Sequence, residues 1–164
     1  MAGPNGVDDK ENTMSGENKI LVPIDLAHES SWRKTLPEAF DRASRQGGTV
    51  TVMTVVPDIM AGLDWRYAIR GETGGSEDLD RRKLVADADE RLRQVVAEYL
   101  PPGMEADTIA RHGAVYEEIL NVAEEIGTDF IIMAANRPSL SDYLLGPNTA
   151  RVVRHARCSV SVIR

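Results

Sequence analysis

The residues best able to bind a charged ligand lie near the end of the chain, where an apolar run precedes a polar loop and a Gly-Pro-Asn-Thr sequence. Residues 129–135 (DFIIMAA) have the length and composition of a buried strand, and residues 150–157 (ARVVRHAR) have a helical pattern. Gly146 and Pro147 suit a helix start, because proline is favoured at the first helical position. Backbone N–H groups at a helix start beside a strand end attract anions, above all a nucleotide phosphate.

Side chains around this helix start can add to an anion site. The N–H groups of Asn148 and Thr149, together with the Thr149 hydroxyl, are candidates to contact phosphate, and Arg137 adds a planar cation in the preceding loop. Simpler interpretations stay open, because Gly146-Pro147 is also an ordinary helix entry and Arg137 can be a solvated loop residue.

Two earlier strand ends should reach the same edge of the sheet. Asp25 follows an apolar run at 19–24, where its carboxylate can accept from a ribose hydroxyl or a base amine, or can cap the next helix or stabilise a turn. Val55 and Val56 end a β-branched run and can form an apolar wall for a flat ring, although strand packing explains them equally well. The predicted nucleotide-binding residues are Pro23, Ile24, Asp25, Val55, Val56, Ala134, Asn136, Arg137, Gly146, Pro147, Asn148 and Thr149.

Other chemistries find little support in the sequence. His28, His112 and His155 do not have the spacing of zinc ligands, and no nucleophile elbow, zinc-protease motif or P-loop is present. No general base is evident for attack by water, so we predict no catalytic residue and at most slow hydrolysis of a bound nucleotide.

Composition indicates one soluble domain of 164 residues. A net charge of -7 argues against a nucleic-acid partner, although residues 151–157 form a local basic cluster. The single cysteine, Cys158, excludes an intramolecular disulfide and is expected to be a buried small hydrophobe. Apolar runs are too short for membrane insertion and residues 1–19 lack a signal-peptide core, so we expect a cytoplasmic protein.

The pattern along the chain predicts a disordered tail at 1–18 and a single domain at 19–164. A long loop at 57–76 holds Trp65 and Tyr67, which either cover a ligand or anchor the loop. The predicted strands lie at 19–24, 49–56, 104–111 (an edge strand), 129–135 and 159–163. The predicted helices lie at 30–46, at 77–100 with Leu84, Ala88, Leu92, Val95 and Tyr99 on one face, at 114–126, and at 150–157 with a basic pattern. Pro37 leaves two alternatives for the first of them: either its first turn is irregular, or the regular helix begins at Thr35, where Thr35 and Glu38 have capping-box spacing.

Strands that alternate with helices indicate an α/β fold with a parallel sheet covered on both faces. Ligands of such folds bind at the carboxyl ends of the strands, where the winding direction reverses. The final strand, SVSVI at 159–163, is a candidate edge for pairing with a second copy of the chain.

Three segments resemble the universal stress protein family: KILVPIDLAHESS at 19–31, GAVYEEILNVAEEIGTDFIIMAA at 113–135 and LLGPNTARVVRHARCSVSVIR at 144–164. The resemblance implies a Rossmann-like three-layer sandwich with a five-stranded parallel sheet in the order 3-2-1-4-5. It also implies homodimers through the last strand, with tetramers as a further option, and a cytoplasmic role in stress response. Members of this family divide into those that bind ATP and those that do not.

The chain departs from the family's ATP-binding pattern, Gly-x2-Gly-x9-Gly-Ser/Thr. Ala134 and Arg137 stand at the first two glycines, eight residues separate Arg137 from Gly146, and Pro147 replaces the hydroxyl residue. A Cβ at a former glycine limits how closely backbone approaches phosphate. The chain instead resembles a variant subgroup with an Ala-x-x-Arg-Pro loop. This resemblance implies that the loop can still hold adenine nucleotides.

The resemblance therefore favours a regulator that binds ATP or AMP, with Mg²⁺ carried by the nucleotide, and that acts through dimerisation and an unidentified protein partner. One alternative is a nucleotide-free interaction module that uses the edge at 159–163 and the exposed face of the helix at 77–100. The other is a weak ATPase.

Overall fold

The computed structural model of the protein describes residues 18–58, 76–135 and 145–164. Several predictions lie outside the described residues: the tail apart from Asn18, most of the loop at 57–76 with Trp65 and Tyr67, and the site residues Asn136 and Arg137. Asn18 itself is the first residue of a strand, so this strand begins one residue earlier than predicted.

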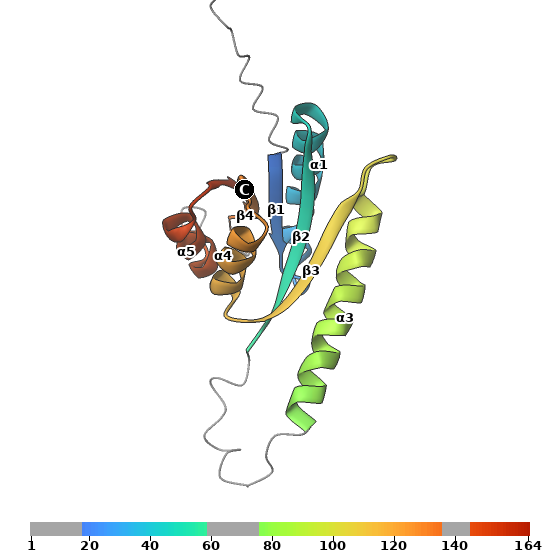
Figure 1. Ribbon diagram of the computed structural model, residues 1–164, viewed down its shortest axis with the longest axis vertical. Helices are drawn as coiled ribbons and strands as arrows, with labels where there is room; N and C mark the ends of the chain where they lie inside the picture. Colours follow the sequence, from blue (N-terminus) through green and yellow to red (C-terminus); the bar gives the residue numbers. More distant parts are fainter. Residues whose placement is uncertain (1–17, 59–75, 136–144) are drawn as a thin grey trace, which may run out of the picture.

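The described chain forms one parallel five-stranded sheet in the order β3-β2-β1-β4-β5, which confirms the predicted α/β fold and strand order. Helices α1 and α3 cover one face, and α4 and α5 cover the other (Figure 1). The elements are β1 (Asn18–Ile24), η1 (Glu29–Ser31), α1 (Thr35–Gln46), β2 (Gly48–Pro57), α3 (Ser76–Tyr99), β3 (Ala106–Gly113), α4 (Val115–Glu125), β4 (Phe130–Ala134), α5 (Pro147–His155) and β5 (Ser159–Ile163).

Two apolar cores lie on opposite faces of the sheet. Successive residues of a strand point to opposite faces, so Ile20 and Val22 of β1 pack under α1 and α3, whereas Leu21 packs under α4 and α5. All three are essentially inaccessible to water. Burial on both faces explains why the central strands read as continuous apolar runs.

Helix α1 begins at Thr35, as one of the two predicted alternatives had it, but the capping box predicted with that start is wrong. Lys34 occupies the cap position without a side-chain hydrogen bond, and Thr35 lies inside the first turn. The Thr35 hydroxyl donates to the carbonyl oxygen of Ser31 at 2.7 Å and so ties the helix to η1. Pro37 falls in the first turn, where a backbone N–H has no partner within the helix, so its missing donor is not needed.

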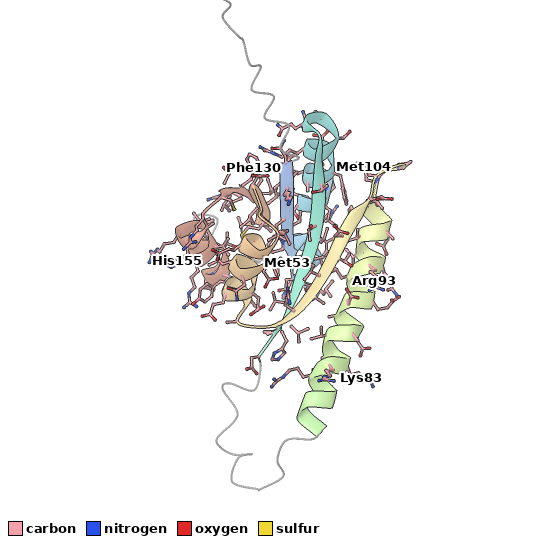
Figure 2. All side chains as sticks on the ribbon, in the orientation of Figure 1. Met53, Lys83, Arg93, Met104, Phe130 and His155 are labelled. Atoms are coloured by element: carbon pink, nitrogen blue, oxygen red, sulfur yellow. The ribbon has the colours of Figure 1, made fainter. Side chains whose placement is uncertain are left out.

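The predicted apolar face of α3 is only half correct. Leu92 and Val95 are buried, but the Leu84 side chain is 54% exposed. A helix of 24 residues is about 36 Å long, and an eight-residue strand such as β3 is about 26 Å long, so α3 outruns the sheet that supports it. Figure 1 shows the start of α3 reaching beyond the strands, and Figure 2 labels Lys83 and Arg93, both exposed, along it.

Cys158 lies just before β5 and is half-buried, rather than fully buried as predicted. It packs beside the core under α4 and α5, and this burial raises the pKa of its thiol. No helix in the described ranges is both long and apolar enough to cross a lipid bilayer.

The two leucines of α3 allow a matched test of its position. We expect Leu92→Ala to lower the free energy of unfolding by about 2–5 kcal/mol, because it opens a cavity in the core. Leu84→Ala should change it by less than about 0.5 kcal/mol, since that side chain is exposed. Urea denaturation measures both free energies of unfolding. Equal losses in the two variants would contradict the overhang of α3, by which we mean that its start extends beyond the sheet.

Candidate functional site

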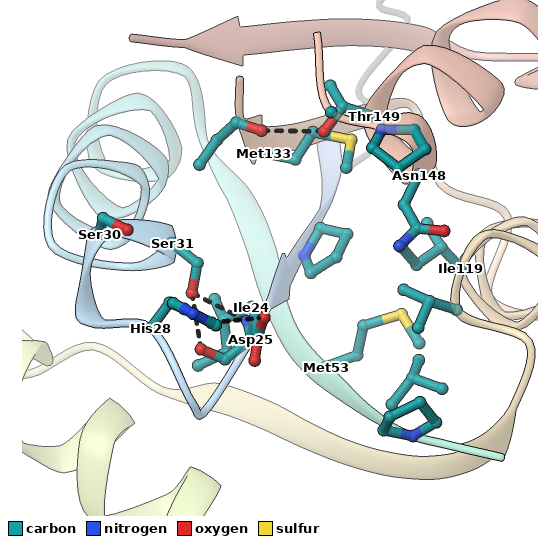
Figure 3. A pocket seen from close by; sticks show the side chains of 17 residues that line it. Ile24, Asp25, His28, Ser30, Ser31, Met53, Ile119, Met133, Asn148 and Thr149 are labelled. Carbon is teal, nitrogen blue, oxygen red and sulfur yellow. Dashed lines mark hydrogen bonds and ion pairs between the residues drawn. The ribbon is translucent and has the colours of Figure 1, made fainter. Parts of the chain in front are cut away.

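A pocket of about 470 Å³ opens at the carboxyl ends of β1, β2 and β4, which is where the sequence predicts the site. This volume is within the range of small-molecule sites. Side chains from these strands, from the turn after β1 and from the starts of α4 and α5 surround it (Figure 3). The lining residues are Pro23, Ile24, Asp25, His28, Ser30, Ser31, Met53, Val55, Pro57, Val115, Ile119, Met133, Ala134, Gly146, Pro147, Asn148 and Thr149.

One end of the pocket is the start of α5. Gly146 is the cap residue and Pro147 the first helical residue, as predicted. The Gly146 N–H donates to Ala135 O at 3.0 Å, and the Ala150 N–H donates to Gly146 O at 2.9 Å as the first bond within the helix. The N–H groups of Asn148 and Thr149 precede that bond, so they have no acceptor within the helix. This end of the pocket therefore carries the positive end of the helix dipole.

The Thr149 hydroxyl does not have its predicted role. It donates to Ala134 O at 3.1 Å, and the residue is only 6% exposed. The proton that was predicted to face phosphate is thus used to fasten α5 to the end of β4. Of the two Thr149 groups, the backbone N–H remains a candidate phosphate donor beside that of Asn148.

The opposite end of the pocket is the turn after β1. The Asp25 N–H donates to Ser31 Oγ at 2.8 Å, and the Ser31 hydroxyl donates back to Asp25 O at 3.0 Å. The Asp25 carboxylate accepts the Ala27 N–H on Oδ1 at 3.0 Å. Asp25 therefore is a turn residue, as one of the two predicted readings had it, and its side chain nonetheless stays 46% exposed at the pocket.

His28 also lines this end, and the sequence analysis missed it. Its ring nitrogen Nδ1 lies 2.9 Å from Asp25 Oδ2, and its side chain is 38% exposed. The Asp-x-x-His spacing was a usable signal, because residues three apart in a tight turn face each other, as Asp25 and His28 do here. Ser30 and Ser31 of η1 complete the polar end of the pocket.

The middle of the pocket is apolar. Val55, Met53, Met133 and Ile119 form its floor and wall. Val56 was predicted to share this wall, but it does not line the pocket, because the next residue along a strand points to the opposite face. Because side chains alternate between the two faces of a strand, the sequence alone could have shown that only one of the two valines faces the pocket.

Nine of the twelve predicted residues line one pocket, although they come from three strands and a helix separated by up to 126 positions (23 to 149). Val56 lies elsewhere, and Asn136 and Arg137 fall outside the described residues. Across residues 18–58, 76–135 and 145–164, no group of three or more His, Cys, Asp and Glu side chains could hold a metal ion.

A parallel sheet wound in both directions from β1, with a pocket where the direction reverses, defines a Rossmann-like α/β protein. The sequence model described as "Universal stress protein family" matches residues 17–164, and the chain belongs to this family.

Individual relatives agree with this assignment. The chain is 28% identical to universal stress protein G of Shigella flexneri over 147 residues, which cover 88% of the chain and 97% of the relative. Among solved structures, it is similar to the universal stress protein UspA from Lactobacillus plantarum, with a TM-score of 0.62 and 29% identity. The match covers 90% of this chain and 97% of the UspA chain. It shares the fold of a universal stress protein solved in complex with cAMP, with a TM-score of 0.54 and 18% identity. This match covers 90% of the chain and 97% of the solved structure.

The hydrogen bond of Thr149 can be tested without any ligand. We expect Thr149→Val to lower the free energy of unfolding by about 1–3 kcal/mol, because it leaves the Ala134 carbonyl without its donor. The same substitution at the exposed Thr49 serves as the control and should be nearly neutral. If urea denaturation finds the two variants equally stable, the hydroxyl does not hold α5 in place.

Proposed function

We propose that the protein binds an adenine nucleotide, ATP or AMP, in this pocket and acts as a regulator in stress response. The observation that carries the proposal is the polarity of the pocket. It has a helix start at one end, hydrogen-bond acceptors at the other and an apolar section between them. A nucleotide has the same order: an anionic phosphate, a sugar and a flat base whose edge carries polar groups.

The two ends differ enough to fix the direction of the ligand. Phosphate is attracted to the N–H groups of Asn148 and Thr149 at the start of α5. The Asp25 carboxylate repels phosphate and accepts from hydroxyl or amine donors, so the adenosine part lies at the turn after β1. Val55 and Met53 then lie beside the base.

Family relatives support adenine nucleotides as the ligand class, because one protein of this fold was solved with cAMP. Asn136 and Arg137 of the Ala-x-x-Arg-Pro loop are the further candidates for phosphate contacts, on the sequence alone. Mg²⁺ would arrive with the nucleotide. The proposal assigns no catalytic residue and allows at most slow ATP hydrolysis.

The regulatory part of the proposal uses β5, an outer strand of the sheet. Ser159 N–H donates to Asp129 O, and Ile163 O accepts from Ala135 N–H, so alternate residues of β5 bond to the β4 side. The backbone groups of Val160 and Val162 therefore point to the open edge. We propose that this edge pairs with β5 of a second copy in a homodimer, which can assemble further into a tetramer, and that the dimer meets a regulatory protein in the cytoplasm.

Nucleotide binding is tested by mass spectrometry of small molecules released from the purified protein, followed by calorimetric titration with ATP and AMP. We expect bound nucleotide or micromolar affinity. Arg137→Ala and Asn148→Ala keep the backbone N–H groups but remove the guanidinium and the side-chain amide as proposed further donors to phosphate. Each should weaken binding by about 5- to 50-fold, as for lost hydrogen bonds to a charged group. Arg91→Ala and Asn121→Ala, at exposed positions outside the pocket, should leave affinity unchanged.

A parent protein that neither retains nucleotide nor gives heat with ATP or AMP would contradict the proposal and favour a nucleotide-free interaction module. Unchanged affinity in both variants would instead reject the phosphate contacts assigned to these two side chains while leaving binding itself in place.

The dimer edge is tested with one backbone change. Val162→Pro removes the outward N–H of β5 but leaves the bonds to β4, so we expect a monomer by light scattering coupled to size exclusion. Val162→Ala keeps the N–H and should remain a dimer. A Val162→Pro protein that melts cooperatively and still runs as a dimer would place the interface elsewhere.

A further inference from the structure

His28 is a polar side chain of the pocket to which neither the family resemblance nor the predicted site assigns a role. Its Nδ1 is held 2.9 Å from Asp25 Oδ2, and it lines the pocket at the end opposite Asn148 and Thr149 (Figure 3). The second ring nitrogen, Nε2, lies on the other side of the imidazole. Within the described residues, no hydrogen bond to Nε2 is found.

The contact with Asp25 fixes which atoms of the ring can donate. An ionised carboxylate only accepts hydrogen bonds, so the Nδ1 atom of His28 must carry the proton. In the neutral imidazole this leaves Nε2 as an acceptor, because the partner of one ring nitrogen decides the state of the other. Asp25 thus determines which hydrogen-bonding state Nε2 of His28 presents to the pocket.

Two neighbouring donors at this end are already used within the turn. The Ser31 hydroxyl proton is already given to Asp25 O, and the Ala27 N–H is already given to Asp25 Oδ1. Ser30 has the remaining hydroxyl, and it can either donate or accept. The end of the pocket around His28 therefore matches a ligand edge that offers hydrogen-bond donors.

The order of groups in the pocket decides which part of a nucleotide meets His28. Phosphate lies at α5 in the proposed function, and the ribose follows it directly. The apolar section formed by Met53 and Val55 then accommodates the flat base. The far edge of the base, rather than the sugar, is left to face the turn after β1.

We propose that His28 Nε2 accepts a hydrogen bond from the exocyclic 6-amino group of a purine, and that the Asp25–His28 pair thereby selects adenine over 6-oxo purines. The inference rests on the proposed function. Hypoxanthine and guanine carry an oxygen acceptor at this position, so two acceptors would face each other. A site that is built to bond a donor rejects an analogue that lacks it.

The test compares ATP with ITP, which differ at the 6-position and in the proton on N1. Calorimetry gives the ratio Kd(ITP)/Kd(ATP) for the parent, for His28→Phe and for His28→Gln. His28→Phe keeps a ring of similar size without the acceptor, so the ratio should fall by about 3- to 10-fold, mainly because ATP binds more weakly.

His28→Gln can present either its amide oxygen or its amide nitrogen, so it should bind both nucleotides and bring the ratio close to one. The matched control is His155→Ala, which removes an exposed histidine at the far end of α5 (Figure 2) and should preserve the parental ratio. Thermal unfolding confirms that each variant is folded.

The outcomes distinguish the role of His28 from nucleotide binding itself. A parent that binds ATP, with a ratio unchanged in His28→Phe, overturns the role of His28 but leaves the proposed function intact. Equal weakening of ATP and ITP also overturns it, because His28 would then contact the part that both nucleotides share. A parent that binds neither nucleotide overturns the proposed function and this inference together.

Discussion

The attachment of α5 to the end of β4 is the constraint on which the pocket depends. Two hydrogen bonds make it: the Gly146 N–H to Ala135 O, and the Thr149 hydroxyl to Ala134 O. They place the start of a helix across the pocket from the turn that holds Asp25. Without them the pocket would have one polar end instead of two, and the opposed chemistry of its ends would be lost.

Much of this arrangement could be predicted from local sequence. Apolar runs located the strands, and the ends of parallel strands had to meet at one edge, which brought nine predicted residues into one pocket. Gly146-Pro147 located the start of α5 because proline and glycine restrict or permit particular backbone angles. The prediction of the strand order came from the family resemblance rather than from these local patterns.

Other features depend on tertiary contacts that no local pattern encodes. The Thr149 hydroxyl can turn toward a ligand or toward Ala134 O, and only the packed neighbour decides. The exposure of Leu84 depends on the length of β3, which is fixed by a different part of the chain. Asp25 had two predicted roles, and the structure gives it the turn contacts while leaving part of its carboxylate exposed, so the two roles are compatible.

The overhang of α3 has a consequence for how the molecule opens. Around Leu84 the helix is held mainly by its own backbone hydrogen bonds, whereas around Leu92 it is also held by the core. Amide protons near Leu84 can therefore exchange with solvent through local fraying, at a free energy well below that of global unfolding. Amide protons near Leu92 exchange only when the helix separates from the sheet, which requires the core to open. A single continuous helix thus combines a segment of low local stability with one that reports the stability of the whole domain.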